Sequence, residues 1–231
     1  MGERVRRKGT SGTTSSRMGR PPFADREAIV AAALEIGLAE LTMTAVAKRL
    51  GTSHSTLYGY FRSRDELAAA AVDYAVDAIE WPEPEQDWRA FLAATAWAHW
   101  RLYSSHPGLA QEIITLRLTS AALVRRYNRT GVALLDYGFG GQDATLVMDM
   151  IAELVVQAFV STAEGEPTAQ PSAAPQARRR ALIEPWLESY DPRLRATLVA
   201  AVAGPPEAWF ERKVELFLDG VAGRGPALPP S

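Results

Sequence analysis

Residues 41–67 read LTMTAVAKRLGTSHSTLYGYFRSRDEL, and this stretch decides the fold of the N-terminal part of the chain. Val46, Ala47 and Leu50 fall on one face at helical spacing. Gly51 follows directly, where a helix that ends in a left-handed residue favours glycine. Because Ala47 is small, a second helix can cross this one closely. The spacing therefore predicts the first half of a helix-turn-helix.

The rest of the stretch predicts two further helices. Ser53 is suited to cap a helix over about 54–61, from which Leu57 points inward. Ser63 and Glu66 then form an S-x-x-E capping box, which begins the next helix. The whole stretch is thus a helix-turn-helix followed by a linking helix.

No acidic residue occurs from Thr42 to Arg64. Helices that only pack together have no reason to exclude carboxylates, whereas a surface that faces phosphate does, because acids there are repelled. A simple packed helix pair is the alternative. The outward face of the second helix carries short polar groups and one aromatic ring, from His54, Ser55, Thr56 and Tyr58. This favours a helix that lies in the DNA major groove.

This segment resembles the DNA-binding domain of the TetR family of bacterial transcriptional regulators. The resemblance spans about 25–67 and rests on Leu41-Thr42, Val46-Ala47, Leu50-Gly51, Thr56-Leu57-Tyr58, Tyr60-Phe61 and Arg64-Asp65-Glu66-Leu67. It implies a homodimer that binds a two-fold operator in double-stranded DNA and responds to a small molecule. Repression is the commoner role in the family, and activation stays open. The alternative function is a DNA-bound structural or interaction protein with the same head and no effector.

Helical periodicity and its breaks predict an all-α chain with no strand. Its parts are a disordered basic arm (1–22), a three-helix helix-turn-helix domain (23–67) with a linking helix to about 80, a helical effector-binding and dimerisation domain (85–222) with a mobile loop (164–177), and a tail (223–231).

Charge is distributed unevenly along the chain. Residues 1–64 hold eleven Lys/Arg and five Asp/Glu, a net +6, whereas residues 65–231 hold fourteen and twenty-two, a net −8. A basic first quarter is the footprint of a DNA-binding head. Within the arm, Arg20 is a candidate for insertion into the minor groove. A solvated basic leader without a partner is the alternative.

Several classes of function are not expected from the composition. With no cysteine, disulfides, zinc fingers and thiol catalysis are excluded, and a cytoplasmic location is expected. No apolar run is judged long enough to span a membrane. His99 and His106 lack both cysteine partners and a carboxylate at HExxH spacing, so no metal is expected. Neither a cofactor nor enzymatic activity is predicted.

Predicted DNA contacts fall into two groups. Contacts to base edges are predicted for four residues at the second helix and for one residue of the first. These are Ser53, His54, Ser55 and Tyr58, and Thr44. Phosphates are assigned to Thr42, Thr56, Tyr60 and Arg64. Phosphate contacts set affinity and its salt dependence, and base contacts set sequence choice.

The second domain contains an aromatic helix over 88–103 that is apolar around nearly its whole circumference, which is typical of a central buried helix. An effector cavity is predicted around four of its residues and four from helices expected to face it: Trp97, His99, Trp100, Tyr103, Arg117, Met150, Glu153 and Gln157. Such a lining suits an apolar or aromatic compound. Ordinary core packing is the alternative for each of these residues.

Two late helices, over 144–163 and about 207–221, carry more apolar surface than a monomer needs. Two such helices from each of two subunits can form a four-helix interface. The predicted interface residues are Leu154, Phe159, Phe210, Val214 and Phe217. The alternative is one buried hairpin within a monomer.

Overall fold

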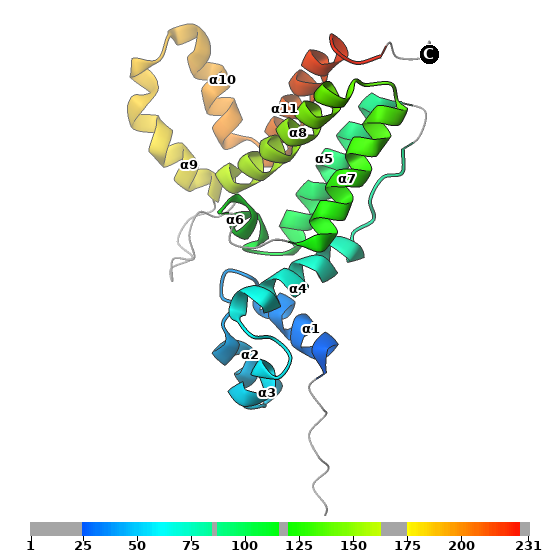
Figure 1. Cartoon of the computed structure of the whole chain (residues 1–231). Coiled ribbons are helices and arrows are strands. Elements are labelled where there is room, and N and C mark those ends of the chain that lie inside the picture. Colours follow the sequence, from blue (N-terminus) through cyan, green and yellow to red (C-terminus); the bar gives the residue numbers. More distant parts are fainter. Residues whose placement is uncertain (1–24, 85–86, 116–119, 163–174, 227–231) are drawn as a thin grey trace, which may run out of the picture.

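The computed structural model describes residues 25–84, 87–115, 120–162 and 175–226. Within these residues the chain is helical and has no strand, as predicted. The head consists of α1 (Arg26–Ile36), α2 (Met43–Leu50) and α3 (His54–Tyr58), and α4 (Arg64–Ala78) links it to the body (Figure 1). The body comprises α5 (Trp88–Ser105), α6 (Leu109–Ile114), α7 (Ala121–Asp136), α8 (Gly141–Thr162), α9 (Pro175–Ile183), η1 (Glu184–Ser189), α10 (Pro192–Ala203) and α11 (Pro206–Ala222).

Side-chain caps begin α2 and α4, and the cap of α4 is the one that the sequence predicts. The Thr42 hydroxyl accepts from the amide of Ala45 at 3.0 Å, and the Ser63 hydroxyl accepts from the amide of Glu66 at 3.1 Å. Gly51 ends α2 in the left-handed region with φ 61°. Since each cap satisfies an amide that the helix itself leaves unpaired, the cap fixes where the helix starts.

α3 is shorter than predicted. It ends at Tyr58, and the amides of Tyr60 and Phe61 both donate to the carbonyl of Leu57 at 2.9 Å. This tight turn takes Phe61 into the core of the head, where it is fully buried. The predicted end at residue 61 is wrong because burial of this phenyl ring requires the chain to turn.

The head has its own apolar core, which continues along α4. Ile29, Val46, Leu57, Phe61 and Leu67 all have no exposed surface. Fully burying one such side chain stabilises the fold by about 1.5–3 kcal/mol. α3 is therefore a rigid platform although it has a single turn and a half.

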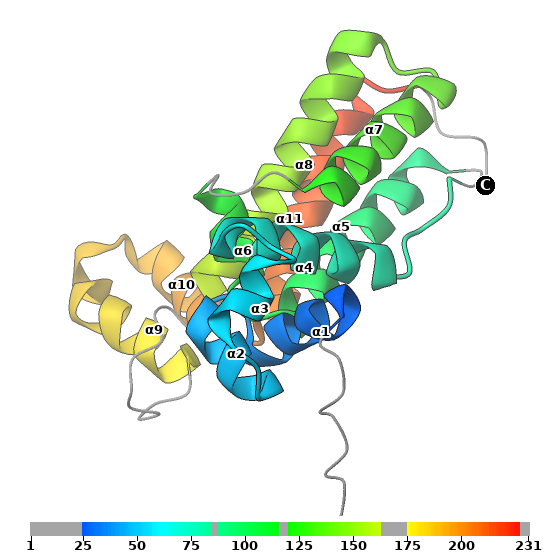
Figure 2. The same cartoon turned by 60° about the horizontal axis from the view of Figure 1, so that its bottom comes forward.

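α5 lies at the centre of the body, in contact with α8 and α11. Trp100 stacks on Phe210 of α11 with ring centroids 4.4 Å apart, and its edge meets Phe159 of α8 at 5.1 Å. α9 and α10 pair with each other and project from the body in both views (Figures 1 and 2). α9 begins at Pro175, inside the predicted loop 164–177, so the last part of that loop is wrong; residues 163–174 lie outside the described residues.

One helix departs from the expectation that no segment is long and apolar enough to cross a membrane. Residues Gly141–Ser161 of α8 have a mean hydropathy of 1.6 and meet that test by length and composition. Central helices of soluble proteins meet it too, and the inner stripe of α8 packs into the body through Val147, Ile151 and Val155. A third of this window is buried within the chain. The outer apolar residues of α8, such as Leu146, remain at the surface of the protomer.

Candidate DNA interface, head–body junction and effector region

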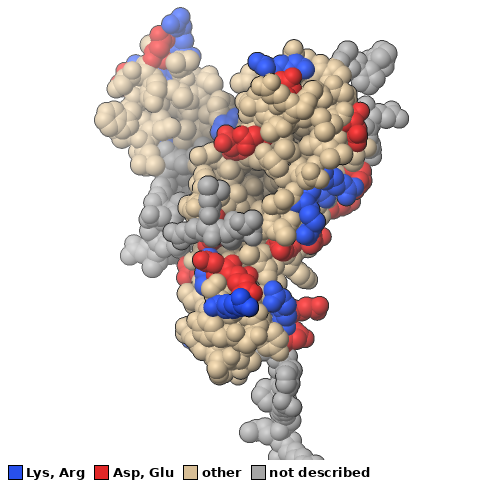
Figure 3. All heavy atoms as spheres, in the orientation of Figure 1, with Lys and Arg blue, Asp and Glu red and all other residues tan. Residues whose placement is uncertain are grey.

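The outward face of α3 carries the side chains that the sequence assigns to DNA. His54, Ser55, Thr56 and Tyr58 are exposed, the last at 51%, whereas Leu57 points into the core. Figure 3 shows that the tip of the head, where α3 lies, is free of both charged colours. An uncharged, hydrogen-bonding surface on a capped helix is suited to reading base edges.

Two of the predicted DNA contacts also have structural roles. The Ser53 hydroxyl caps α3 and bonds to the hydroxyls of Ser55 at 2.8 Å and Thr56 at 2.9 Å. The Thr42 hydroxyl caps α2. Ser53 therefore holds the neighbouring hydroxyls in place, and its own oxygen is already engaged.

The remaining residues assigned from α2 and the following turn differ in exposure. Thr44 is exposed on α2, and Tyr60 is partly buried below α3. Arg20 lies outside the described residues. The described part of the predicted interface is therefore α3 with the start of α2.

Two cations of the described head are engaged by groups of the head itself. Arg49 forms an ion pair with Glu35 at 2.5 Å. Arg26 lies over the Phe61 ring at 4.2 Å and donates to the carbonyl of Tyr60 at 3.1 Å. Two exposed cationic side chains have no such contact among the described residues: Lys48 of α2 and Arg62 before α4. Their side chains are free to contact phosphate, and their position in the acid-free run was the signal for them.

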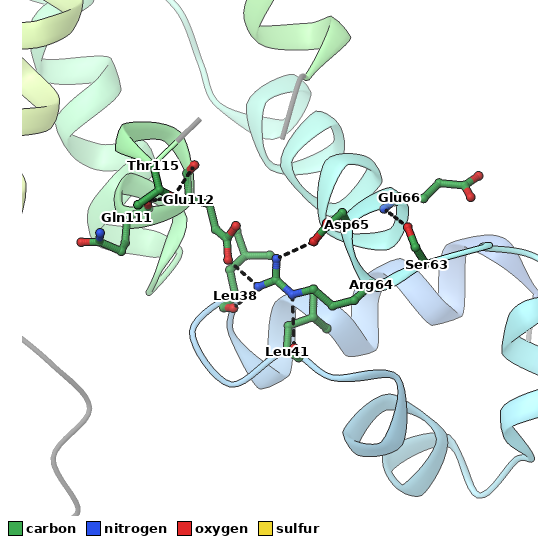
Figure 4. Close-up of polar contacts among 9 residues, drawn as sticks. All are labelled: Leu38, Leu41, Ser63, Arg64, Asp65, Glu66, Gln111, Glu112 and Thr115. Atoms are coloured by element: carbon green, nitrogen blue, oxygen red, sulfur yellow. Dashed lines mark hydrogen bonds and ion pairs between the residues drawn. The ribbon is translucent and has the colours of Figure 1, made fainter. Parts of the chain in front are cut away.

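Arg64, which the sequence assigns to phosphate, is engaged by groups within the protein. Its guanidinium lies between the head and α6 (Figure 4). It pairs with Glu112 of α6, donates to the carbonyl of Leu38 at 2.8 Å and to that of Leu41 at 3.3 Å, and reaches Asp65 at 3.4 Å. The hydrogen bond to Glu112 raises the pKa of Arg64 against the opposing effect of burial. Arg64 thus joins the head to the body.

Backbone contacts complete this junction. The amide of Leu38 donates to the carbonyl of Pro107 at 3.0 Å. Gly108 has φ +86°, and a Cβ there would lie 2.4 Å from the amide nitrogen of Ala39. Only glycine permits such an approach. The turn after α1 is therefore held between Arg64 and the segment that leads into α6. Glu112, which forms the ion pair with Arg64, was not singled out from the sequence.

Two family models match the chain in succession. Residues 26–71 match the bacterial regulatory proteins of the tetR family, and residues 81–224 match the tetracyclin repressor-like C-terminal domain. The chain belongs to the TetR family of transcriptional regulators. TetR family proteins bind operator DNA as dimers and bind small-molecule effectors.

Relatives of known name agree over most of the chain. The class C tetracycline repressor protein of Escherichia coli is 27% identical over 203 residues, which cover 85% of this chain and 90% of the repressor. The Streptomyces coelicolor TetR family protein ActR, solved with actinorhodin, is 25% identical with TM-score 0.69, covering 87% of this chain and 97% of ActR. A point variant of TetR from Acinetobacter baumannii, solved with minocycline, shares the fold at 20% identity and TM-score 0.59, covering 87% of this chain and 99% of that one.

The predicted effector residues of this TetR family chain separate into two groups. Trp97, His99, Trp100 and Tyr103 lie on α5 and contact one another in pairs, with Trp97 and Trp100 centroids 6.2 Å apart and His99 and Tyr103 centroids 6.3 Å apart. The residues assigned from α8 are exposed on its outer side: Met150, Glu153 and Gln157. Their assignment to an internal cavity is therefore wrong, because the other side of α8 faces α5. Arg117 lies outside the described residues.

Polar groups sit within this aromatic region. His99 Nδ1 bonds to the carbonyl of Thr95 at 2.9 Å, and its ring meets that of Trp81 in a T-shaped contact with centroids 4.7 Å apart. Burial lowers the pKa of His99 to about 4, although its ring keeps some solvent contact. Burial also raises the pKa of Tyr103. The Thr95 hydroxyl is buried without a hydrogen-bond partner. A buried polar oxygen with no partner is costly and suited to a ligand.

The predicted dimer residues mostly face the interior of their own protomer. Phe210 and Val214 are only 1% and 2% exposed, and Leu154, Phe159 and Phe217 pack against the same core. Phe210 and Val214 therefore belong to the core of the body. The outward apolar residues of these helices are Leu146 at 44%, Met150 at 45% and Leu216 at 74% exposed.

Proposed function

We propose that this regulator is a repressor that binds a two-fold DNA operator as a homodimer and releases it when a small apolar or aromatic molecule binds in the body. The observation that carries the DNA-binding part is the exposed, uncharged face of α3, in which His54, Ser55 and Tyr58 stand on a capped helix above a fully buried Leu57. Base edges of the major groove are recognised by side chains of this kind. Lys48 and Arg62 supply phosphate contacts on either side.

The dimer is proposed to form through the outer faces of α8 and α11. Leu146, Met150 and Leu216 leave an apolar surface on the two helices that TetR-like four-helix interfaces use. A two-fold operator needs two reading helices about 34–36 Å apart, which one protomer does not supply. A sedimentation mass of one chain at micromolar concentration would contradict the dimer.

The effector is proposed to bind beside α5. ActR, a similar protein, has been solved with actinorhodin, and this chain carries Trp97, Trp100 and Tyr103 on its own central helix α5, with a buried, unpartnered Thr95 hydroxyl on the same helix. A displacement of α6 would be transmitted to α4 through Glu112 and Arg64. This mechanism requires the effector to bind more tightly to the conformation in which the spacing of the two heads does not match the operator.

A second candidate is a DNA-bound interaction protein without an effector. The tight stacking of Trp100 on Phe210, with centroids 4.4 Å apart, favours it, because a filled core leaves less room for a ligand. Both candidates share the head. They differ in whether any small aromatic compound releases DNA.

Selection of bound DNA from a random pool tests the shared part. We expect a palindrome, and Tyr58→Ala is expected to weaken binding to it about tenfold, since one base contact contributes about 1–3 kcal/mol. The matched control is Tyr74→Ala, because Tyr74 is a similarly exposed tyrosine on α4, 58% exposed against 51% for Tyr58. Equal affinities of the two variants would exclude α3 as the reading helix.

A further inference from the structure

A cavity of about 400 Å³ lies where the end of α4 and the following connector meet α7. Three arginines of α7 line it together with acidic and aromatic residues: Val76, Asp77, Ile79, Trp81, Glu83, Ala122, Arg125, Arg126 and Arg129. Figure 3 shows blue atoms with red ones beside them on this face of the molecule, at the lower end of α7. The cavity is large enough for a small organic molecule.

Arg129 lies four residues after Arg125 and three after Arg126, so its side chain is a neighbour of both on the surface of α7. Arg125 pairs with Asp77 of α4 at 3.2 Å, and Arg129 pairs with Glu83 of the connector. Arg126 has neither a hydrogen bond from its guanidinium nor an ion pair among the described residues. The unpaired charge of Arg126 therefore lies beside that of Arg129, and like charges at this spacing repel one another, which favours an added anion.

Trp81 holds Arg126 in position. The guanidinium carbon lies 4.6 Å from the centroid of the Trp81 ring, whose indole N–H donates to the Val76 carbonyl at 2.8 Å. A ring fixed in this way holds the guanidinium in a cation–π contact that leaves its N–H donors available. Burial and the neighbouring Arg129 lower the pKa of Arg126 against the opposing effects of Glu83 and Asp77.

Charge decides which class of anion fits. Three arginines and two carboxylates give the lining a net charge of +1. A monoanion neutralises this charge, whereas a phosphate dianion would leave an excess negative charge beside Asp77 and Glu83. A carboxylate also matches the planar fork of an arginine, with two parallel N–H···O bonds.

We propose that this cavity binds a small organic monocarboxylate, anchored by the guanidinium of Arg126. The Trp81 ring contacts both the guanidinium of Arg126 and, with centroids 4.7 Å apart, the ring of His99 on α5. The cavity lining contains no residue of α5, so the site borders the proposed effector region without including it. Its occupation can be measured without DNA, so the result is independent of whether the proposed repressor function is correct.

Thermal unfolding of the full-length protein in sodium benzoate tests the proposal, with benzamide as the uncharged analogue and ionic strength held constant. A ligand that binds only the folded state raises the melting temperature with its concentration. We expect a saturable rise with benzoate and none with benzamide. An equal rise with benzamide, or a larger rise with inorganic phosphate at pH 8, would overturn the proposed ligand class.

Substitution locates the binding site. Arg126→Gln is expected to weaken benzoate binding at least tenfold, and Arg126→Lys to weaken it less, because lysine keeps the charge but not the fork. Arg101→Gln is the matched control, since Arg101 is exposed on α5 and outside the cavity lining. Calorimetric titration gives the affinities of all four proteins. Unchanged affinity in both Arg126 variants would overturn the assignment.

Discussion

The head and the body of this protein are both built from amphipathic helices, yet they differ in what fixes the position of each functional side chain. In the head, a cap within three residues fixes the start of α3 and thereby the direction of His54 and Tyr58. In the body, the position of a side chain depends on which side of a largely apolar helix faces its neighbour. Local interactions thus position the side chains of α3 in the head, whereas long-range packing positions the side chains of the proposed effector region in the body.

The largest expected effect tests whether Phe210 belongs to the core of the body or to a dimer interface. Phe210→Ala removes a ring that is 1% exposed and stacked on Trp100 at 4.4 Å. We expect the free energy of unfolding to fall by about 3–5 kcal/mol, the usual cost of such a cavity. Urea denaturation over a range of protein concentrations measures it.

Leu216→Ala is the control, because Leu216 is 74% exposed on the same helix. We expect it to weaken dimerisation with little change in the stability of the protomer. If Phe210→Ala lowered only the dimerisation affinity, the placement of Phe210 in the core would be wrong.

The second effect concerns the ion pair that joins the two regions. Glu112→Gln leaves the guanidinium of Arg64 without its charged partner at a site where Glu112 is 6% exposed. Breaking a fully buried pair costs about 3–5 kcal/mol, and the partial exposure of Arg64 reduces the expected loss to about 2–3 kcal/mol. The midpoint of urea unfolding measures this loss.

Glu35→Gln provides the matched control for that substitution. Glu35 also pairs with an arginine, Arg49, but both side chains are 58% exposed. An exposed pair contributes about 0–1 kcal/mol, so this variant should unfold close to the wild-type midpoint. Equal losses in the two variants would mean that Arg64–Glu112 is an ordinary surface pair.

Sequence reasoning succeeded where the contacts are local. The caps Ser53 and Ser63 and the left-handed Gly51 are confirmed, because each contact joins residues a few positions apart. Arg64 and Glu112 are 48 positions apart, and no local pattern brings them together. The sequence therefore identified Arg64 as a cation but not its partner.

α8 shows why the body was harder to predict. Val147 and Ile151 are buried while Leu146 and Met150 are exposed, although all four are apolar. A helix that is apolar on more than one side does not reveal which side faces α5. The same ambiguity led to Met150 being assigned to the cavity and Phe210 to the dimer interface.

The third effect is a dependence of the stability of the protein on pH, which arises from His99 in the body. His99 has a folded-state pKa of about 4, lowered by burial and by the nearby charge of Arg126 against the favourable hydrogen bond to the Thr95 carbonyl. Between pH 6.5 and 4 the unfolded chain takes up this proton and the folded chain does not, so stability falls as pH falls through this window. The full shift corresponds to about 3 kcal/mol, and residual solvent contact of the ring reduces the expected loss to about 2 kcal/mol.

His99→Gln tests this origin, since glutamine is uncharged and polar. We expect the variant to lose that part of the acid dependence while keeping most of its stability at neutral pH. Melting temperatures measured from neutral pH down to about pH 4 give the difference. Parallel curves for the wild type and the variant would show that another group is responsible.

The smallest expected effect returns to the head. Ser53→Ala removes the hydroxyl that accepts from the Thr56 amide at 3.2 Å and bonds to two neighbouring hydroxyls. Losing such a cap costs about 1 kcal/mol. We expect faster hydrogen exchange at the amides of α3 and weaker operator binding, with little change in the exchange of the body.

Ser55→Ala is the matched control for the cap, because Ser55 bonds to the Ser53 hydroxyl without capping the helix. If Ser55→Ala weakened operator binding while leaving α3 exchange unchanged, Ser55 would be a base contact and Ser53 a framework residue. Equal exchange in both variants would instead contradict the cap as the feature that holds the reading face in place. The head would then depend, as the body does, on the packing of its buried side chains more than on local hydrogen bonds.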